Sequence, residues 1–267
     1  MTQQLFIRHT TTYSYSEPVP FGLQQLRLTP RSCNMQDVVE WNINVEGGKI
    51  ETSYDDQHMN RVTLISFDQD VTQINVLCEG TIQTKEVHGV VGQHVGCMPM
   101  WMYEKPTALT KAGPACRAIL NSVDGDTGSL AWLHALSAAI LEAVPYETGK
   151  TDPDWTAEDA ADAAHGVCQD HTHIFLACCR YADIPARYVS GYLMMDDRTD
   201  QEAAHAWAEA YLEGLGWVGF DVSNGISPDT RYVRVATGLD YAEAAPISGH
   251  RLGTADEELS VQVQVQQ

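Results

Sequence analysis

The sequence predicts an α+β protein in two parts: an antiparallel β-sandwich-like domain over residues 1–100 and a core of helices and antiparallel strands over residues 101–267. Three observations support this prediction. The length of 267 residues exceeds the roughly 150 residues of a typical single domain. Short runs of β-branched and aromatic residues fill the first 95 positions. Helical patterns then lie between residues 129 and 183, and strand patterns follow them.

The N-terminal strands are predicted from five short runs separated by turn residues such as the glycine pair at 47–48. The runs are LFIRHTTTYSYS, QLRLTPRS, VVEWNINVEGG, RVTLISF and INVLCEGTIQTKEV. Residues 96–114 contain three prolines among small and polar residues, which is typical of a connector. The boundary between the two parts is therefore expected near residue 100.

Two helices are predicted next. Residues 129–144 place leucine and isoleucine at spacings of three and four, and this pattern ends before Pro145. Residues 168–183 have helical composition and end at Ile184-Pro185. Between them, residues 151–166 are acidic, and we expect an exposed loop with a short helix. The strands predicted after the helices are ARYVSGYLMM, AHAWAEAYL, GWVGFDV, TRYVRVA and ELSVQVQVQ.

The charge is strongly negative, with 16 Lys+Arg against 36 Asp+Glu and a net charge of −20. Phosphate backbones and anionic lipid surfaces would be repelled, so nucleic acid and membrane partners are not expected. Acidity of this size is typical of a soluble protein or of a salty medium, and a preference for cationic substrates is the alternative. Nothing in the composition predicts the oligomeric state.

The cysteines and the N-terminal segment predict a cytoplasmic protein. The seven cysteines form no regular framework, and Cys178 and Cys179 are adjacent, which favours a reducing compartment. The opening residues have no apolar run of the signal-peptide type, and no stretch approaches the roughly 18 apolar residues of a membrane span.

Cys168 is the candidate nucleophile. It stands at the start of the predicted helix 168–183, where unpaired N–H groups and the helix dipole stabilise a thiolate. Asp170 in the same turn opposes that negative charge, so a cationic partner is needed. His171 and His173 lie on the same helix and are poorly placed for proton transfer, which favours a histidine from the sheet.

His205 is that candidate, with Asp221 as its carboxylate. His205 opens the strand AHAWAEAYL, and Asp221 lies on the strand that returns after EGLG. A three-residue loop would place 221 opposite 205, and a five-residue loop would place it opposite 207, diagonal to 205. Either register leaves the two side chains within reach, and the carboxylate would then orient the imidazole.

An oxyanion needs donors near the nucleophile. The backbone N–H of Cys168 is the natural first donor, and Gln169 or Trp132 is the candidate for the second. Trp207 shares a strand face with His205 and could contact substrate or pack in the core. His173 belongs to the same segment and is interpreted as either a site residue or a core histidine that joins helix to sheet.

The segments GVCQDHTHIFLACCRYADIPARYVSGYL and AHAWAEAYLEGLGWVGFDVSNG resemble the transglutaminase-like superfamily, specifically its bacterial members classed as cysteine proteases. HTTTYSYSEPV and QLRLTPR also resemble the β-rich domain that precedes the core in that group. The resemblance implies a papain-like core with Cys168, His205 and Asp221 as nucleophile, base and carboxylate. His165 and His171 depart from the family's usual pattern.

The expected activity is therefore cysteine-dependent hydrolysis of an amide bond in a peptide or protein, through a thioester and without a cofactor. Transfer of the acyl group to an amine is the alternative outcome of the same chemistry. A non-catalytic binding protein on the same fold is a second alternative. A zinc site built from His165, Cys168, His171 and His173 is disfavoured because the spacing is irregular, so no metal is expected.

Overall fold

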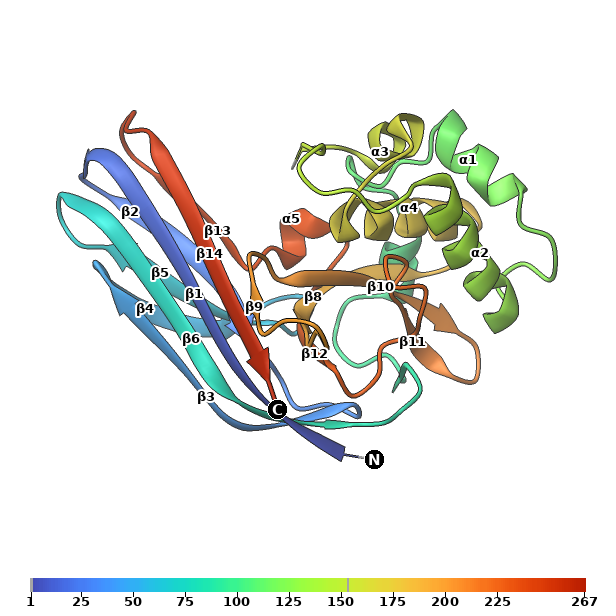
Figure 1. The fold of residues 1–267 in the computed structure, drawn as a ribbon, viewed down its shortest axis with the longest axis horizontal. Helices are drawn as coiled ribbons and strands as arrows, with labels where there is room; N and C mark the ends of the chain where they lie inside the picture. The colour runs from blue at the N-terminus through green and yellow to red at the C-terminus, as the bar shows by residue number, and fades with distance from the viewer. Residues whose placement is uncertain (1, 153) are drawn as a thin grey trace.

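The computed structural model describes residues 2–152 and 154–267; residues 1 and 153, in the predicted β domain and the predicted acidic segment, lie outside this description. Three antiparallel sheets and a helical layer build the fold, and Figure 1 shows the elongated sheets on one side and the helices on the other. The predicted α+β class is confirmed. None of the helices in the described part is long and apolar enough to cross a membrane.

Two of the sheets form a sandwich. The first has the order β3-β6-β1-β14-β9 and the second β13-β2-β5-β4. The strands of the first are β3 (Gln36–Glu46), β6 (Val71–Lys85), β1 (Thr2–Val19), β14 (Glu257–Gln266) and β9 (Asp200–Gln201). Those of the second are β13 (Ile247–Arg251), β2 (Gly22–Thr29), β5 (Arg61–Phe67) and β4 (Gly48–Asp55). Alternate side chains of these strands point inward and form one buried apolar cluster that includes Leu26, Ile65 and Ile74.

The third sheet carries the core and has the order β12-β8-β10-β11-β7. Its strands are β12 (Tyr232–Gly238), β8 (Ala186–Leu193), β10 (His205–Leu212), β11 (Gly216–Phe220) and β7 (Val90–Gly92). The helices are η1 (Met100–Glu104), α1 (Pro114–Asn121), α2 (Leu130–Ala143), α3 (Ala157–Ala163), α4 (Cys168–Tyr181) and α5 (Tyr241–Ala244). Of these, α4 makes the most extensive contact with the sheet and packs along β10 and β8.

The chain crosses the boundary predicted near residue 100 in both directions. Strands β13 and β14 pair with β2 and β1 of the sandwich, although the sequence placed residues 247–266 in the core. Strand β7 pairs with β11 of the core sheet, although it precedes residue 100. Residues 247–266 are therefore assigned to the sandwich and β7 to the core sheet. The sequence of one strand does not show which distant strand it will pair with.

An apolar cluster joins the sandwich to the core. Side chains of β1, β6 and β14 pack there against side chains of β8 and β12. The members that are fully or almost fully buried are Leu5, Ile7, Ile82, Tyr192, Val233, Val263 and Val265. The Tyr192 hydroxyl and His9 Nδ1 add a buried hydrogen bond of 2.8 Å across the same boundary. The two parts are therefore joined by an apolar cluster at their boundary, which lies between the separate clusters of the sandwich and of the helical layer.

Candidate active site

Cys168 is the first residue of α4, and the turn in front of it is held by hydrogen bonds. The Val167 N–H donates to Asp170 Oδ2 at 2.8 Å, and the Glu147 N–H donates to the Gly166 carbonyl at 2.9 Å. Asp170 is buried, and burial raises its pKa. The amide groups of the first turn of α4 thus surround a thiol whose backbone position is fixed.

His205 is the first residue of β10 and is buried next to Asp221. Its Nε2 lies 2.6 Å from Asp221 Oδ2, and its ring stacks on Trp207 with centroids 6.3 Å apart. Burial alone would lower the pKa of His205, but the Asp221 charge and hydrogen bonds to Asp221 and Cys168 raise that pKa to about 10. Since Asp221 occupies Nε2, Nδ1 is the nitrogen that faces the Cys168 thiol.

Asp221 Oδ2 accepts two further hydrogen bonds. The Tyr232 hydroxyl donates to it at 2.7 Å, and Asn224 Nδ2 donates to it at 2.7 Å. Burial favours the neutral carboxyl, yet the His205 charge and the three hydrogen bonds outweigh burial and lower the pKa of Asp221. The carboxylate is therefore ionised and held in one orientation against the imidazole.

The hairpin has the register of the second alternative, but its loop is residues 213–215, which are three residues and not the five expected for that register. Leu212 pairs with Gly216 and Ala208 with Phe220, so the register places residue 221 opposite 207 and diagonal to 205. Asp221 lies just beyond β11, in a two-way backbone bridge with Ile226. The carboxylate reaches His205 across the strands from this diagonal position.

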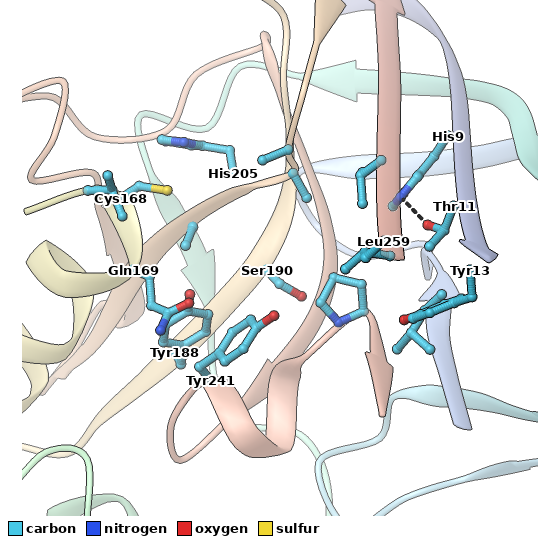
Figure 2. A pocket seen from close by; sticks show the side chains of 17 residues that line it. His9, Thr11, Tyr13, Cys168, Gln169, Tyr188, Ser190, His205, Tyr241 and Leu259 are labelled. Carbon is cyan, nitrogen blue, oxygen red and sulfur yellow. Dashed lines mark hydrogen bonds between the residues drawn. The ribbon is translucent and has the colours of Figure 1, made fainter. Parts of the chain in front are cut away.

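Cys168 and His205 open into a cavity of about 290 Å³ between the core and the sandwich. In Figure 2 the Cys168 sulfur points toward the cavity below the His205 ring, and His9, Thr11 and Tyr13 of β1 lie on the opposite side. The remaining lining residues are Val167, Gln169, Tyr188, Ser190, Ala203, Ala204, Ala206, Tyr241, Pro246, Ile247, Leu259 and Val261. The N-terminal domain therefore forms one wall of the site.

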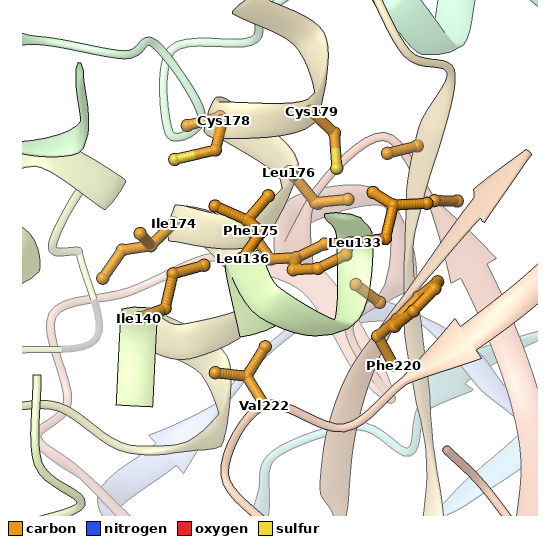
Figure 3. Close-up of a cluster of buried hydrophobic side chains, with 14 of the residues drawn as sticks. Leu133, Leu136, Ile140, Ile174, Phe175, Leu176, Cys178, Cys179, Phe220 and Val222 are labelled. Atoms are coloured by element: carbon orange, nitrogen blue, oxygen red, sulfur yellow. The ribbon is translucent and has the colours of Figure 1, made fainter. Parts of the chain in front are cut away.

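The helix that carries Cys168 is anchored by apolar packing. In Figure 3, Leu133, Leu136 and Ile140 of α2 lie against Ile174 and Phe175 of α4. The Phe175 ring also stacks on Phe220 of β11, with centroids 5.2 Å apart. This packing fixes the distance between the start of α4 and the sheet that carries His205.

The four remaining predicted site residues have different locations. Gln169 lines the cavity beside Cys168, and Trp207 supports the His205 ring without lining the cavity. Trp132 of α2 is buried in the apolar cluster between the helices and the core sheet, and it is not among the residues that line the cavity. The prediction of Trp132 as an oxyanion donor is therefore corrected.

His173 is also outside the cavity, which corrects its prediction as a substrate contact. It is fully buried, and burial lowers its pKa to about 3, so the ring is neutral. Its Nε2 accepts a hydrogen bond from the Tyr241 N–H at 3.2 Å. His173 is thus a core histidine whose hydrogen bond joins α4 to α5, and its ring contacts the sheet through Tyr188 of β8, with centroids 5.3 Å apart.

The other two histidines of the segment are used for structure as well. His171 Nε2 donates to the Val144 carbonyl at 2.7 Å, and His171 Nδ1 lies 2.8 Å from Ser223 Oγ. His165 Nδ1 donates to the Ala163 carbonyl at 2.9 Å. Within the described ranges, no three His, Cys, Asp or Glu side chains converge in a way that could hold a metal ion.

Sequence reasoning missed two groups of residues at this site. Asn224 and Tyr232 bind Asp221, and the only signal was the spacing of three in DVSN, which suits a side-chain turn. The wall formed by β1 and β14 was missed because neither strand carries a motif. Only tertiary pairing brings these strands to the cavity.

Comparison with known proteins gives the family. Residues 117–222 match the transglutaminase-like superfamily, and residues 5–83 match the bacterial transglutaminase-like N-terminal region. An uncharacterized protein of Mycobacterium leprae is 26% identical in an alignment 270 positions long that covers 96% of each chain. An uncharacterized protein of Mycobacterium tuberculosis is 33% identical in an alignment 127 positions long that covers 44% of this chain and 40% of that protein.

A solved structure has the same fold. A protein from Cytophaga hutchinsonii, described as "a putative cysteine protease", superposes with a TM-score of 0.76 at 21% identity. The superposition covers 99% of this chain and 93% of that one, so the sandwich and the core occur together in both. With its core and its N-terminal region both matched, this chain belongs to the transglutaminase-like superfamily.

Proposed function

We propose that the protein is a cysteine-dependent hydrolase that cleaves an amide bond in a peptide or protein, with Cys168 as nucleophile, His205 as general acid and base, and Asp221 as the orienting carboxylate. One observation carries the proposal. The Cys168 thiol and His205 line the same cavity, Cys168 is among the groups that raise the pKa of His205, and His205 Nε2 lies 2.6 Å from a buried carboxylate. This is the arrangement that a thiol nucleophile requires.

The reaction proceeds in two stages. The Cys168 sulfur, its proton held on His205 Nδ1, adds to the carbonyl carbon of the substrate amide. His205 then gives that proton to the leaving nitrogen, the C–N bond breaks, and an amine departs from a thioester on Cys168. Water next adds to the thioester as His205 takes one of its protons. The C–S bond breaks, the carboxylic acid leaves, and the proton returns to the Cys168–His205 pair.

The tetrahedral oxygen formed at each stage needs hydrogen-bond donors. The N–H of Cys168 is available because the first residue of an α-helix has no intrahelical acceptor. The Gln169 side chain lines the same cavity and is proposed as the second donor. Trp207, stacked on His205, acts as a positioning residue.

The cavity favours an uncharged group beside the bond that is cleaved. None of its lining residues is Asp, Glu, Lys or Arg, and burial lowers the pKa of His9 to about 4, so His9 is neutral at pH 7. The net charge of −20 attracts cationic peptides at long range. The proposed substrate is thus a peptide or protein, cationic overall, with an uncharged side chain in the cavity.

The test compares two cysteines. Wild-type protein, Cys168→Ala and Cys97→Ala are incubated with iodoacetamide near neutral pH and, separately, with a peptide library, and adducts are read by mass spectrometry. Cys97 is exposed and serves as the matched control. We expect rapid alkylation and an acyl adduct at Cys168, loss of turnover in Cys168→Ala, and wild-type turnover in Cys97→Ala.

The products separate the alternatives. A free acid as the main product supports hydrolysis, whereas preferential formation of a new amide with an added amine identifies an acyltransferase. If Cys168 reacted no faster than Cys97 and no library peptide were turned over, the proposal would be wrong and a binding role would remain. Wild-type turnover by Cys168→Ala would contradict it directly.

A further inference from the structure

A second cavity of about 540 Å³ lies between the sandwich and the core and shares no lining residue with the first. Loops of the sandwich around residues 31–34 and 58–60 form one side, and β7, β8 and β12 contribute the other. Three arginines line it, Arg31, Arg187 and Arg234, and none of its lining residues is Asp or Glu. A lining with three arginines and no carboxylate is unusual in a chain whose net charge is −20.

Two of these arginines share one carboxylate behind the wall. Glu209 on β10 is fully buried, and its Oε2 lies 2.6 Å from Arg187 Nη2 while its Oε1 accepts from Arg234 Nε at 2.8 Å. Arg187 also lies over the Trp217 ring, with its guanidinium carbon 3.9 Å from the ring centroid. The cluster therefore holds two positive charges against one negative charge in a buried setting.

The third arginine stands at the rim. Arg31 Nη1 lies 2.9 Å from Asp55 Oδ2, and the same carboxylate also pairs with Arg61 at 3.5 Å. The three lining guanidinium groups thus lie against two carboxylates, and Asp55 is shared with Arg61. Two further carboxylates contact lining residues: Asp56, which also pairs with Arg27, and Glu243, which pairs with His58. Arginines therefore still outnumber carboxylates around the cavity, by five to four.

A buried charge that lacks a counter-charge destabilises a protein unless a ligand or solvent compensates it. Guanidinium groups bind carboxylates and phosphates through paired N–H donors, and partial burial strengthens such bonds. Arg234 uses Nε and Nη2 for Glu209, which leaves Nη1 without a hydrogen bond to that carboxylate. A ligand oxygen in the cavity would give Arg234 an acceptor group besides Glu209, and would give Arg31 one besides Asp55 and the Met59 carbonyl.

We propose that this second cavity binds a small organic anion through a carboxylate or phosphate group, with Arg234 and Arg31 as its ligands and Arg187 as the buried support. The volume exceeds that of a bare inorganic ion, so the anionic group would carry a further polar portion. The site is separate from Cys168, and the inference does not depend on the chemistry proposed there.

The experiment is isothermal titration calorimetry of the full chain with inorganic phosphate and, in a second arm, with citrate. Ionic strength is held constant with sodium chloride, so that a general salt effect is removed. We expect saturable binding at one site per chain in at least one arm, and the arm that binds more tightly shows whether phosphate or carboxylate is preferred.

Two rim variants provide a matched pair. Arg31→Gln and Arg61→Gln each remove one partner of Asp55, but only Arg31 lines the cavity. Arg31→Gln should weaken binding about tenfold, the size expected for one charge-assisted hydrogen bond, and Arg61→Gln should leave it within about twofold. Arg234→Met should abolish binding. Should that variant fail to fold by circular dichroism, the rim pair still decides.

Saturable binding that is lost in Arg31→Gln and kept in Arg61→Gln supports the site. Absence of saturable binding in both arms overturns it. Equal weakening by the two rim variants overturns it as well, because the binding would then follow the overall charge of the chain.

Discussion

At the scale of single residues, one carboxylate oxygen organises the candidate active site. Asp221 Oδ2 lies within 2.7 Å of donors from His205, Asn224 and Tyr232. His205 belongs to β10, Asn224 to the turn that follows β11, and Tyr232 to β12. These donors keep the carboxylate ionised despite its burial. The ionised carboxylate in turn keeps the imidazole protonated and oriented.

Asp221→Asn is expected to move the alkaline limit of activity to lower pH. The Asp221 charge raises the pKa of His205, whereas burial lowers it, so removal of the charge leaves burial dominant. The imidazolium is present below its pKa, and it would therefore be lost at a lower pH in the variant. Turnover should also fall by about 10²–10⁴-fold, as for other carboxylate-oriented histidines.

The measurement is the rate of Cys168 alkylation and of peptide turnover across pH, with Asp229→Asn as a control. Asp229 pairs with Arg231 at 2.7 Å and does not line the cavity. An unchanged alkaline limit in Asp221→Asn would show that the carboxylate does not support the imidazolium.

Tyr232→Phe tests the hydrogen bond that the sequence did not reveal. It removes the 2.7 Å bond to Asp221 Oδ2 and leaves the ring in the core. We expect turnover to fall about tenfold and unfolding free energy to fall by about 1–2 kcal/mol, the range for a lost bond to a buried charged group.

Tyr211→Phe is the matched control, since the Tyr211 hydroxyl bonds Gln93 Oε1 at the surface. Kinetics and urea unfolding compare the two. Equal small effects in both variants would mean that Tyr232 does not hold Asp221.

Some residues of the site could be predicted because the sequence around them has a recognisable local pattern. Cys168 stands at a recognisable helix start, and His205 and Asp221 lie on strands joined by a short turn. Tyr232 has no such local pattern, because a tyrosine in a strand is ordinarily explained by packing alone. Trp132 was a candidate oxyanion donor and His173 a candidate from the segment after Cys168, but both are buried outside the cavity.

At the scale of elements, β8 lies beside β10, the strand that carries His205, and pairs with it in the core sheet. Gly191 of β8 pairs with His205, and the Trp207 ring lies over it. A Cβ atom built at Gly191 would lie 2.1 Å from the Val233 carbonyl oxygen and 2.7 Å from Trp207 Cη2. A glycine at this position thus lets three strands and the supporting ring approach closely.

Gly191→Ala is expected to destabilise the fold by about 1–3 kcal/mol through overpacking and to lower turnover, because Trp207 must move and His205 stacks on it. Gly214→Ala is the comparison. Its φ of +84° disfavours alanine, but no atom lies within 4 Å of the added carbon. Urea unfolding and peptide turnover are measured for both. Full activity in Gly191→Ala would show that the Trp207 ring does not position His205.

Helices α2 and α4 could be predicted closely, whereas α1, α5 and the choice between the hairpin registers could not. Ser129 caps the start of α2, and Pro145 and Pro185 follow the ends of α2 and α4. Residues next to each helix therefore indicate these boundaries. The register between β10 and β11 depends on where the turn closes. EGLG permits more than one closure, and only the packed sheet selects the pair Leu212–Gly216.

At the scale of the whole molecule, the two parts predicted from the sequence are joined by a shared apolar cluster at their boundary. Val263 and Val265 of β14 pack with Tyr192 and Val233 of the core sheet. The sequence predicted β14 as a strand from its strict alternation, but its partner could not be predicted, since β1 lies some 250 residues earlier. Cooperative unfolding is the consequence of this shared cluster.

Calorimetry is therefore expected to show one thermal transition for the full chain. Val263→Ala should destabilise the protein by about 1–3 kcal/mol and shift that single transition to lower temperature. Val95→Ala, at a position 78% exposed, should leave the transition unchanged. Two separate transitions in the wild-type chain, only one of which responded to Val263→Ala, would contradict cooperative unfolding through the shared cluster.

The pairing of β14 with β1 also has a consequence for biosynthesis. Leu259 and Val261 of β14 line the same cavity as Cys168 and His205. A nascent chain that has already emerged through Asp221 holds all three proposed reactive groups but still lacks this wall. The substrate cavity next to the thiol would therefore be complete only after translation has passed Val261. Productive substrate binding is then delayed until β14 has paired with β1 in the sandwich.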